Sequence, residues 1–369
     1  MTTRRTLIIG TGAIADHHAH AVAQHGDRAV VVAGVDLDAS RAQAFAAEHG
    51  LPAWGTDLAT ALAGELPTAD GGTTGRPDLA HICTPPGSHV PLALQCLEAG
   101  VAVLLEKPPA LSLAEMDVLI KASRRTGVQA SVVVQHRFGG AGLRAARLLA
   151  SGQLGRPLVA TCDTLWFRGP EYYAVPWRGR WDVEGGGPTM GLGIHQLDLL
   201  IALIGPWAEV TAMAARQARD TATEDVSTAV VRFENGALAT IASSALSPRQ
   251  TSHVRVDAER ATVEVEHLYG YGDEHWTVTP APGHEDVARL WATDEPSPDS
   301  GHVSQLAFVL DAMDAGEPVP VTLADARGSL ELVAAIYASA FTGTRVRRGD
   351  IGPGHPFYER MDGTGAPWA

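Results

Sequence analysis

The sequence predicts an α/β protein with two domains. The first is a doubly wound parallel sheet, and the second is an α+β domain with a large, mostly antiparallel open sheet. Through the first third of the chain, short apolar runs alternate with alanine-rich helical patterns, whereas after residue 138 the runs alternate apolar with polar positions. The length of 369 residues allows two or three domains, each large enough to bury its own core.

The first domain is expected over residues 1–138. Its apolar runs predict strands at 6–10, 29–36, 79–85, 101–108 and 128–138. Helical patterns between them predict helices at 14–25, 39–49, 90–99 and 113–126. Because these runs are apolar at nearly every position, the strands are expected to be buried on both faces, as in a parallel sheet covered by helices on both sides.

The second domain is expected over residues 139–345, followed by a tail at 346–369 that lacks periodicity. Helices are expected at 141–150 and 303–315, and strands at 252–257, 262–267 and 276–280. The run 229–246 contains the turn signal Glu-Asn-Gly and therefore predicts a hairpin. Antiparallel pairing follows from these patterns.

Charge, hydropathy and cysteine content limit the partners and the location that the sequence predicts. The formal net charge of −14 disfavours nucleic acid and anionic membranes, and no run of about 18 apolar residues offers a membrane span. The three cysteines, Cys83, Cys96 and Cys162, form no CxxC pair, so we expect reduced thiols, a cytoplasmic location and no bound metal.

A glycine-rich turn follows the first predicted strand. Residues 10–15 read Gly-Thr-Gly-Ala-Ile-Ala, a match to G-x-G-x-x-G/A between a strand and a helix. The first glycine permits the tight turn, and the second lets backbone approach a pyrophosphate at the helix N-terminus. Such a turn alone can also merely connect strand and helix. We predict that it binds a dinucleotide through Gly10, Thr11, Gly12, Ala13 and Ile14.

An acid at the end of the second strand supports that prediction. Asp36 follows Ala15 by about 20 residues, where a carboxylate can accept hydrogen bonds from the adenosine ribose hydroxyls. The same carboxylate would repel a 2′-phosphate, so NAD is predicted as the cofactor. NADP is the less favoured alternative, because Arg41 is close in sequence.

Five motifs in a fixed order resemble the Gfo/Idh/MocA family of sugar and cyclitol oxidoreductases. They are GTGAIA, AGVD, HICTPPGSH at 81–89, EKPPA at 106–110 and GGGPTMGLGIHQLD at 185–198. The resemblance covers roughly residues 5–345. It implies a Rossmann domain, a second domain whose open sheet often forms the interface of a homo-oligomer such as a dimer or tetramer, and a dehydrogenase that uses nicotinamide.

The resemblance also assigns residues. Thr84, Pro85, Pro86 and His89 match the family's loop beside the cofactor. Glu106 and Lys107 match the pair near the nicotinamide, and His195 matches the acid/base histidine.

Alcohol oxidation itself requires such residue types. A base must take the hydroxyl proton while hydride leaves the carbon, and a donor must stabilise the developing alkoxide. Lys107 is one of two lysines in the chain, and lysine, unlike arginine, can lose its proton in an apolar setting. The alternatives are a surface ammonium that pairs with Glu106 and a His195 that serves only helix packing. Many relatives carry aspartate where this chain has Gly191, which increases the expected share of Lys107 in proton transfer.

A segment rich in aromatic and charged residues precedes His195. Residues 165–187 contain six of the chain's 21 aromatic residues, interleaved with arginines and acids. Aromatic faces stack on sugar rings and charged groups bind hydroxyls, although the same types also anchor protein interfaces. Asp198 is expected either to orient His195 or to contact substrate, with a plain helix-turn acid as the alternative. The predicted substrate-binding residues are Trp166, Arg168, Tyr173, Arg178, Trp181 and Asp198.

Together these features predict an NAD-dependent dehydrogenase that acts on a sugar, a sugar derivative or a cyclitol, with Lys107 and His195 as its catalytic residues. Two alternatives remain open at this point. One is glycoside cleavage assisted by transient oxidation with tightly held NAD. The other is a non-catalytic sensor that kept the nucleotide fold.

Overall fold

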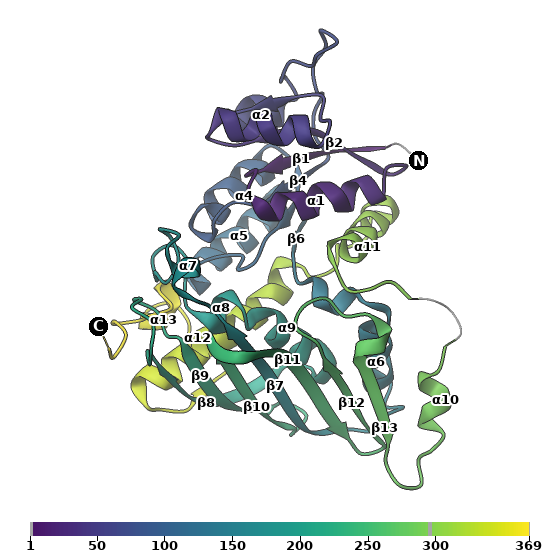
Figure 1. The fold of residues 1–369 in the computed structure, drawn as a ribbon, viewed down its shortest axis with the longest axis vertical. Coiled ribbons are helices and arrows are strands. Elements are labelled where there is room, and N and C mark those ends of the chain that lie inside the picture. Colours follow the sequence, from purple (N-terminus) through teal and green to yellow (C-terminus); the bar gives the residue numbers. More distant parts are fainter. Residues whose placement is uncertain (1–2, 294–296, 369) are drawn as a thin grey trace. The chain divides into compact units, whose positions relative to one another are not determined.

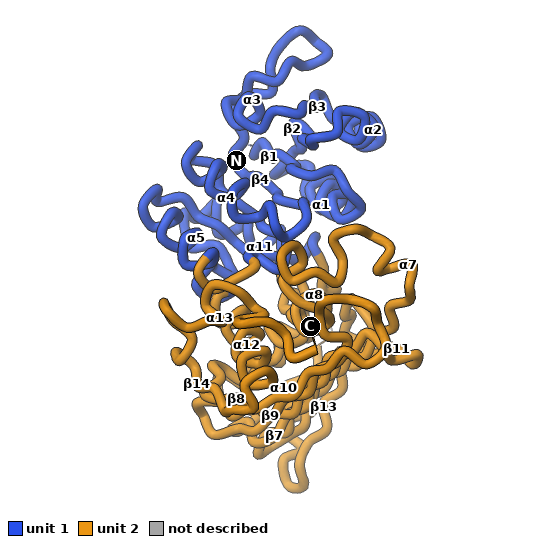
Figure 2. Tube along the Cα trace, turned by 90° about the vertical axis from the view of Figure 1, so that its left-hand side faces the viewer, with its two compact units in different colours: residues 1–110, 115–133, 302–326 blue, residues 111–114, 134–301, 327–369 orange. Residues whose placement is uncertain are grey.

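The computed structural model describes residues 3–293 and 297–368. The chain forms two compact units, coloured separately in Figure 2. The first comprises residues up to Ala110, Glu115–Val133 and His302–Ala326, and the second comprises Leu111–Ala114, Val134–Gly301 and residues from Arg327 onward. The sequence patterns predicted contiguous domains at 1–138 and 139–345, whereas segment 302–326 belongs to the first unit although it lies far along the chain.

The first unit contains a six-stranded sheet in the order β3-β2-β1-β4-β5-β6, and all its pairs are parallel (Figure 1). This confirms the doubly wound parallel sheet. The run at 128–138 is a strand only over its first part and then turns into a short 3₁₀ helix, η2, at Gln135–Phe138. The strands are β1 Arg4–Ile9, β2 Ala29–Val35, β3 Trp54–Gly55, β4 Leu79–Ile82, β5 Ala102–Leu105 and β6 Ala130–Val132.

The helices of the first unit follow the predicted pattern closely. The side chain of Asp38 accepts hydrogen bonds from the amides of Ser40 and Arg41 and so caps α2. Helix α11 packs on α1, where Leu306 and Leu310 join Val22 in the buried core. The helical elements are α1 Ala13–Gln24, α2 Ala39–Glu48, α3 Leu58–Ala63, η1 Pro86–Ser88, α4 His89–Glu98, α5 Leu113–Thr126 and α11 His302–Ala315.

The second unit contains an eight-stranded sheet in the order β13-β12-β11-β7-β10-β9-β8-β14. Its β7–β10 pair is parallel and the other pairs are antiparallel, which confirms the mostly antiparallel sheet. The predicted hairpin joins β9 to β10, with Gly236 at φ 92° in the turn. The strands are β7 Pro157–Phe167, β8 Trp207–Ala215, β9 Val226–Phe233, β10 Leu238–Ser244, β11 Leu246–Ala258, β12 Ala261–Glu266, β13 Trp276–Pro280 and β14 Val346–Arg347.

One face of this sheet is covered by helices. Helix α9 contacts β7 and β11, and the hydroxyl of Ser339 on α12 accepts a hydrogen bond from the Ala212 amide of β8 (Figure 1). On β9 buried and exposed residues alternate, as expected for a sheet covered on one face. The helical elements are α6 Gly140–Ala150, α7 Pro170–Tyr173, α8 Pro188–Gly191, α9 Ile194–Ile204, η3 Asp273–His275, α10 Val287–Trp291, α12 Leu323–Thr342 and α13 Pro356–Glu359.

The C-terminal residues are part of the second unit. Strand β14 pairs with β8, and Ile351, Phe357 and Met361 are buried. The sequence predicted a tail because these apolar residues follow neither a helical nor a strand period. Across the described helices, none combines the length and the apolar character that crossing a membrane requires.

Candidate active site

The glycine turn of the first unit connects β1 to α1 and is tightly packed against the loop after β4. Gly10 adopts φ 84°, and a Cβ added to it would lie 2.6 Å from Cγ2 of Thr84. Only glycine fits this position, because both the backbone conformation and the close approach exclude a side chain. Helix α1 then begins at Ala13, directly after Gly12, with Ile14 in its first turn. The turn therefore presents backbone amides at a helix N-terminus, as a pyrophosphate site needs.

Asp36 holds this turn in place. Its Oδ2 accepts hydrogen bonds from the amide of Thr11 at 2.9 Å and from its hydroxyl at 3.1 Å, while Oδ1 accepts from the Asp38 amide at 3.0 Å. An ionised carboxylate offers about four acceptor sites, so these bonds leave acceptor capacity for ribose hydroxyls. The turn and its acid thus fit the adenosine half of NAD.

The loop after β4 is tied to the loop after β5 through one histidine. The Nε2 of buried His89 lies 2.8 Å from the carbonyl oxygen of Thr84, and its Nδ1 lies 2.8 Å from that of Pro108. Burial lowers the pKa of His89, although both carbonyl contacts oppose that shift. A neutral ring donates to only one of the two carbonyls. Pro85 precedes η1 and Pro86 begins it, so the loop is conformationally restricted beside the glycine turn.

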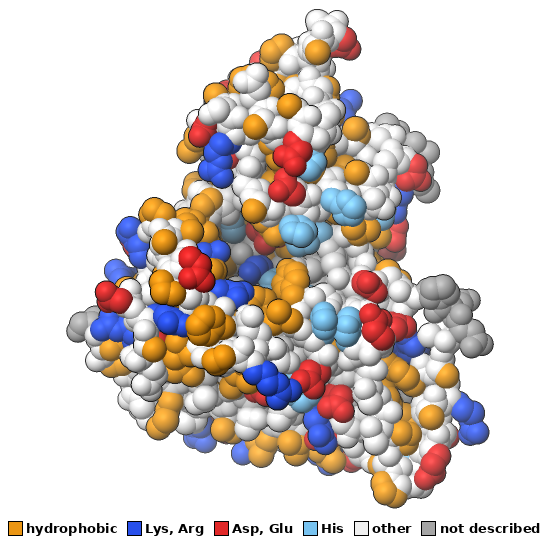
Figure 3. Space-filling view, in the orientation of Figure 1, with side chains coloured by type: hydrophobic (Ala, Val, Ile, Leu, Met, Phe, Trp, Pro, Cys, Tyr) orange, Lys and Arg blue, Asp and Glu red, His pale blue; other side chains and the backbone are white. Residues whose placement is uncertain are grey.

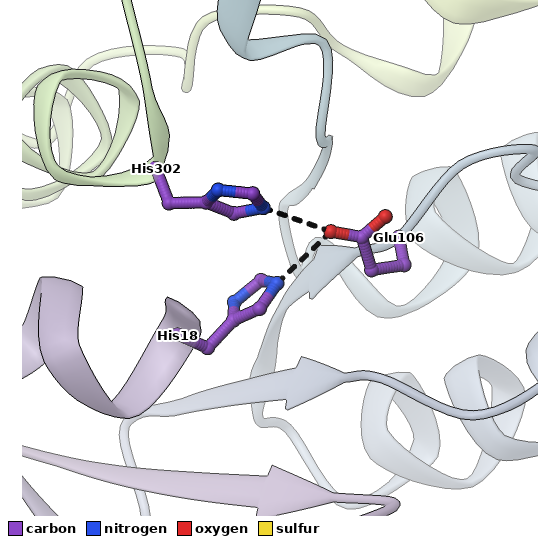
Figure 4. A group of neighbouring side chains, drawn as sticks. All are labelled: His18, Glu106 and His302. Atoms are coloured by element: carbon purple, nitrogen blue, oxygen red, sulfur yellow. Dashed lines mark hydrogen bonds and ion pairs between the residues drawn. The ribbon is translucent and has the colours of Figure 1, made fainter. Parts of the chain in front are cut away.

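Glu106 lies directly after β5 and is buried between two histidines. Its Oε1 lies 3.1 Å from Nε2 of His18 on α1 and 3.0 Å from Nε2 of His302 on α11 (Figure 4). Burial alone would raise the pKa of Glu106, but the hydrogen bonds from His18 and His302 outweigh it and hold the pKa well below its usual range. The carboxylate is therefore ionised in this setting.

The other oxygen of Glu106 fixes the backbone of the candidate catalytic lysine. Oε2 accepts a hydrogen bond from the Lys107 amide at 3.1 Å, and the Lys107 side chain is partly exposed. The sequence predicted that Glu106 lies near the nicotinamide, with pairing to the Lys107 ammonium as the alternative. Oε1 is directed to His18 and His302, a partnership that the sequence did not reveal, and the role of Glu106 beside the cofactor stays a prediction.

In the second unit, His195 lies at the start of α9 within a buried polar and aromatic group. The side chain is 2% exposed, and its ring centroid lies 4.8 Å from that of His136 and 6.0 Å from that of Tyr269. The next residue, Gln196, donates to the Tyr271 hydroxyl at 3.0 Å and accepts from Thr164 at 3.0 Å. These bonds fix the first turn of α9 and with it the backbone of His195.

The carboxylate of Asp198 is buried and already bonded within the second unit. It is fully buried, the guanidinium of Arg137 binds both of its oxygens, and Ser329 donates to Oδ1 at 2.8 Å. These contacts make it part of the packing around α9. Contact of Asp198 with substrate stays a prediction.

Two buried carboxylates lie against the turn before α9, and one of them, Glu224, accepts hydrogen bonds from the backbone of this turn. Glu224 accepts from the amides of Gly187 at 3.0 Å and Thr189 at 3.1 Å and from the Tyr337 hydroxyl at 2.8 Å. Burial raises the pKa of Glu224 to about 7 against the opposing effect of these bonds. The second carboxylate belongs to Glu184, whose Oε1 lies 3.5 Å from the position that a Cβ on Gly191 would take.

Arginines stack on the aromatic rings of the segment predicted to bind substrate. Arg168 lies over Trp166 at 4.6 Å, and Arg178 lies over Trp177 at 3.8 Å and over Tyr172 at 4.3 Å. Arg178 also donates to Glu184 at 2.6 Å. The segment is therefore a folded layer of stacked cations and rings.

The aromatic residues of this segment differ in how far their rings are exposed and in whether their polar groups are already hydrogen-bonded. Trp166 is buried and donates from its indole N–H to Ser252 at 2.8 Å. Trp181 donates to the Ala222 carbonyl at 2.8 Å, and Tyr173 is partly exposed, next to Tyr172. Their roles in substrate binding stay predictions.

Two family models match the chain. The model described as "Oxidoreductase family, NAD-binding Rossmann fold" matches residues 4–134. The model described as "GFO/IDH/MocA C-terminal domain" matches residues 143–264. The two matches lie on the two kinds of sheet described above, in the same order along the chain.

Several relatives are similar over most or part of their length. D-glucoside 3-dehydrogenase of Escherichia coli (strain K12) is 28% identical over 372 residues, covering 93% of this chain and 97% of that protein. D-apiose dehydrogenase of Paraburkholderia graminis is 30% identical over 238 residues, covering 62% of this chain and 57% of that protein. The WlbA dehydrogenase of Bordetella pertussis, crystallised with NADH and UDP-GlcNAcA, is 29% identical with a TM-score of 0.81, covering 94% of this chain and 99% of that one.

Proposed function

The chain belongs to the Gfo/Idh/MocA family of oxidoreductases, and on that premise we propose that it is an NAD-dependent dehydrogenase of a sugar, sugar derivative or cyclitol. The observation that carries the proposal is the turn at Gly10–Gly12 held by Asp36. The names of the relatives support the substrate class, since D-glucoside 3-dehydrogenase and D-apiose dehydrogenase both act on carbohydrate.

Asp36 supports NAD over NADP. Its carboxylate stands at the end of β2, bonded to the turn, where it would repel a 2′-phosphate. Arg41 provides the counter-argument, because its Nη2 lies 3.6 Å from the position of a Cβ on Gly12. NADP is therefore the second cofactor to test rather than an excluded one.

NAD, when bound, supplies the acceptor for the hydride that leaves the carbon. The proton of the oxidised hydroxyl must go to a residue of this chain. We assign that step to Lys107 and His195, with the ammonium form of Lys107 able to hold the developing oxyanion. Glu106 keeps the Lys107 backbone in place through the bond to its amide. Because Gly191 stands where the family resemblance implies an aspartate in many members, no carboxylate from that position can assist His195.

The stacked segment is proposed to bind the ring. Arg168 and Arg178 offer guanidinium donors for hydroxyl groups, and Tyr173 and Trp181 offer partly exposed aromatic rings in the same segment. The same arginines would also bind an anionic group of the substrate.

The exposed face of the eight-stranded sheet is proposed to be the interface of a homo-oligomer, either a dimer or a tetramer. Val159 and Leu238 are register partners on β7 and β10 and are 52% and 42% exposed, while Met213 on β8 is 77% exposed. Light scattering after size exclusion tests this, since Met213→Arg should weaken the assembly. A cytoplasmic location also stays a prediction.

A panel of polyols, free sugars and glycosides tests the proposed function. Each compound is incubated with the protein and NAD⁺ or NADP⁺, and formation of reduced nicotinamide is followed by absorbance. We expect NADH with at least one carbohydrate and a lower rate with NADP⁺. Glycoside cleavage without accumulation of NADH would point to redox-assisted cleavage. Binding of nucleotide without turnover of any compound would contradict the proposal and favour a sensor.

A further inference from the structure

Three side chains of the first unit converge on one point although they are far apart in sequence. The Oε1 of Glu106 lies 3.1 Å from Nε2 of His18 and 3.0 Å from Nε2 of His302, and the three atoms lie within 4.8 Å of one another. Figure 4 shows both rings pointing toward the carboxylate from separate helices. His18 and Glu106 are buried, and the His302 side chain is 10% exposed.

The spacing of these atoms matches that of ligands around one metal ion. Ligand atoms held about 2.0–2.1 Å from a zinc ion, at angles of about 90–110°, lie about 2.9–3.4 Å apart. Both nitrogen–oxygen distances here, 3.1 Å and 3.0 Å, fall in that range, and the two histidine nitrogens lie within 4.8 Å of each other. The carboxylate oxygen is therefore already at ligand spacing from each ring, and binding would require at most a small approach of the two rings.

A second histidine orients one of the ligands. The Nδ1 of His18 lies 2.9 Å from Nδ1 of His81 on β4, which is fully buried. A histidine that binds metal through Nε2 usually donates its other N–H to an acceptor, and His81 offers that acceptor. Metal binding would thus place the His18 proton on Nδ1 and the His81 proton on Nε2. Without metal the His18 Nε2 donates to Glu106, so the tautomers of both rings are reversed.

We propose that His18, Glu106 and His302 form a binding site for a divalent transition-metal ion of the zinc class. Two imidazoles with one carboxylate favour zinc and its neighbours over magnesium or calcium, which prefer oxygen ligands. The ion would join α1, the end of β5 and α11, and its carboxylate ligand would still bond the Lys107 amide through Oε2. The proposal does not rest on the proposed dehydrogenase function.

One of the three ligands, His302, lies next to the protein surface. Exposed His17 stacks on His302 with ring centroids 5.7 Å apart, and histidines reach the surface over α1 in Figure 3. The cysteine spacing predicted no bound metal, and this cluster contains no cysteine.

Zinc binding by the full-length protein tests the proposal. The chain is stripped with a chelator and dialysed, and Zn²⁺ affinity and stoichiometry are measured against a chromogenic chelator. We expect one ion per chain. His302→Gln keeps a hydrogen-bonding side chain but removes a good ligand, so affinity should fall by at least about 100-fold, more than the roughly 10- to 100-fold typical of losing an outer partner.

A second cluster provides the matched control. Asp16, Glu48 and His49 also lie close enough to share an ion, but Asp16 and Glu48 are exposed. His49→Ala should leave the tight site intact. If His49→Ala abolishes binding while His302→Gln does not, or if the unmodified chain holds no zinc against the chelator, the proposal is wrong.

A spectroscopic measurement covers the case in which His302→Gln fails to fold. Co²⁺ added to the stripped wild-type protein should give visible ligand-field absorption, and Zn²⁺ should switch the tautomers of His18 and His81 in ¹⁵N NMR. An unchanged histidine spectrum at one equivalent of Zn²⁺ would overturn the proposal, because the three side chains would then form only a hydrogen-bonded group.

Discussion

The clearest energetic prediction concerns Glu224, which is fully buried. Burial raises its pKa from 4.5 to about 7, which at about 1.4 kcal/mol per pH unit corresponds to about 3 kcal/mol. The folded state therefore binds this proton more tightly than the unfolded state. The associated stability is complete below the unfolded pKa and is lost as pH rises through about 7.

The perturbation that isolates this effect is Glu224→Gln, because glutamine does not titrate. We measure the free energy of unfolding of both proteins with urea from pH 5 to pH 8 at constant ionic strength. The wild type should lose about 2–3 kcal/mol relative to the variant across that range. Buried histidines such as His81, whose burial lowers their pKa, affect both proteins alike and cancel in the difference. Glutamine also lacks the second carboxylate oxygen that accepts from the Gly187 amide. This loss lowers the free energy of unfolding of the variant by the same amount at every pH, so it does not change the pH dependence of the difference.

Tyr337→Phe is the matched variant. The Tyr337 hydroxyl donates to Glu224 and lowers its pKa, so its removal should move the loss of stability to higher pH. A difference between wild type and Glu224→Gln that stays flat from pH 5 to pH 8 would refute the reasoning. It would show that this carboxylate is ionised throughout.

Three further predictions concern single positions. Gly10→Ala should destabilise the chain by at least about 1 kcal/mol more than Gly71→Ala in urea unfolding, because both glycines have φ 84° but only Gly10 has a neighbour, at 2.6 Å, in the way of a Cβ. Gly191→Asp should cost about 1–3 kcal/mol because its carboxylate would lie against Glu184, whereas Gly191→Ala should be tolerated; equal unfolding midpoints would contradict this. Asp36→Asn should raise the Kd of NAD⁺ in calorimetry at least about tenfold and that of NADP⁺ less; an equal effect on both would remove Asp36 from cofactor choice.

The fold was predictable where local patterns determine it. Continuous apolar runs identified the parallel strands, because strands covered on both faces have no polar side. The hairpin at Gly236 followed from its turn residues. The assignment of segment 302–326 to the first unit was not predictable in this way, since it depends on contacts of α11 with α1 across the whole chain.

In the candidate site, too, contacts that belong to a local motif were predictable and contacts between distant segments were not. The bond between Asp36 and Thr11 spans 25 residues and is implied by one strand–turn–helix–strand motif. The bonds from Glu106 to His18 and His302 span 88 and 196 residues, and no spacing rule connects them. The Asp-His-His sequence at residues 16–18 was visible, but histidines on a helix carry no signal about their partners. Buried polar partners of this kind have to be read from the structure.

The most direct test of the central claim is the rate of NADH formation by the wild type and by Lys107→Arg on the best carbohydrate of the panel. The account predicts that the arginine variant keeps its fold and its affinity for NAD⁺ but loses at least about 100-fold in kcat, because a guanidinium cannot take up the hydroxyl proton. A fully active Lys107→Arg variant would contradict the role given to Lys107. Absence of NADH formation by the wild type across the whole panel would contradict the proposed function itself.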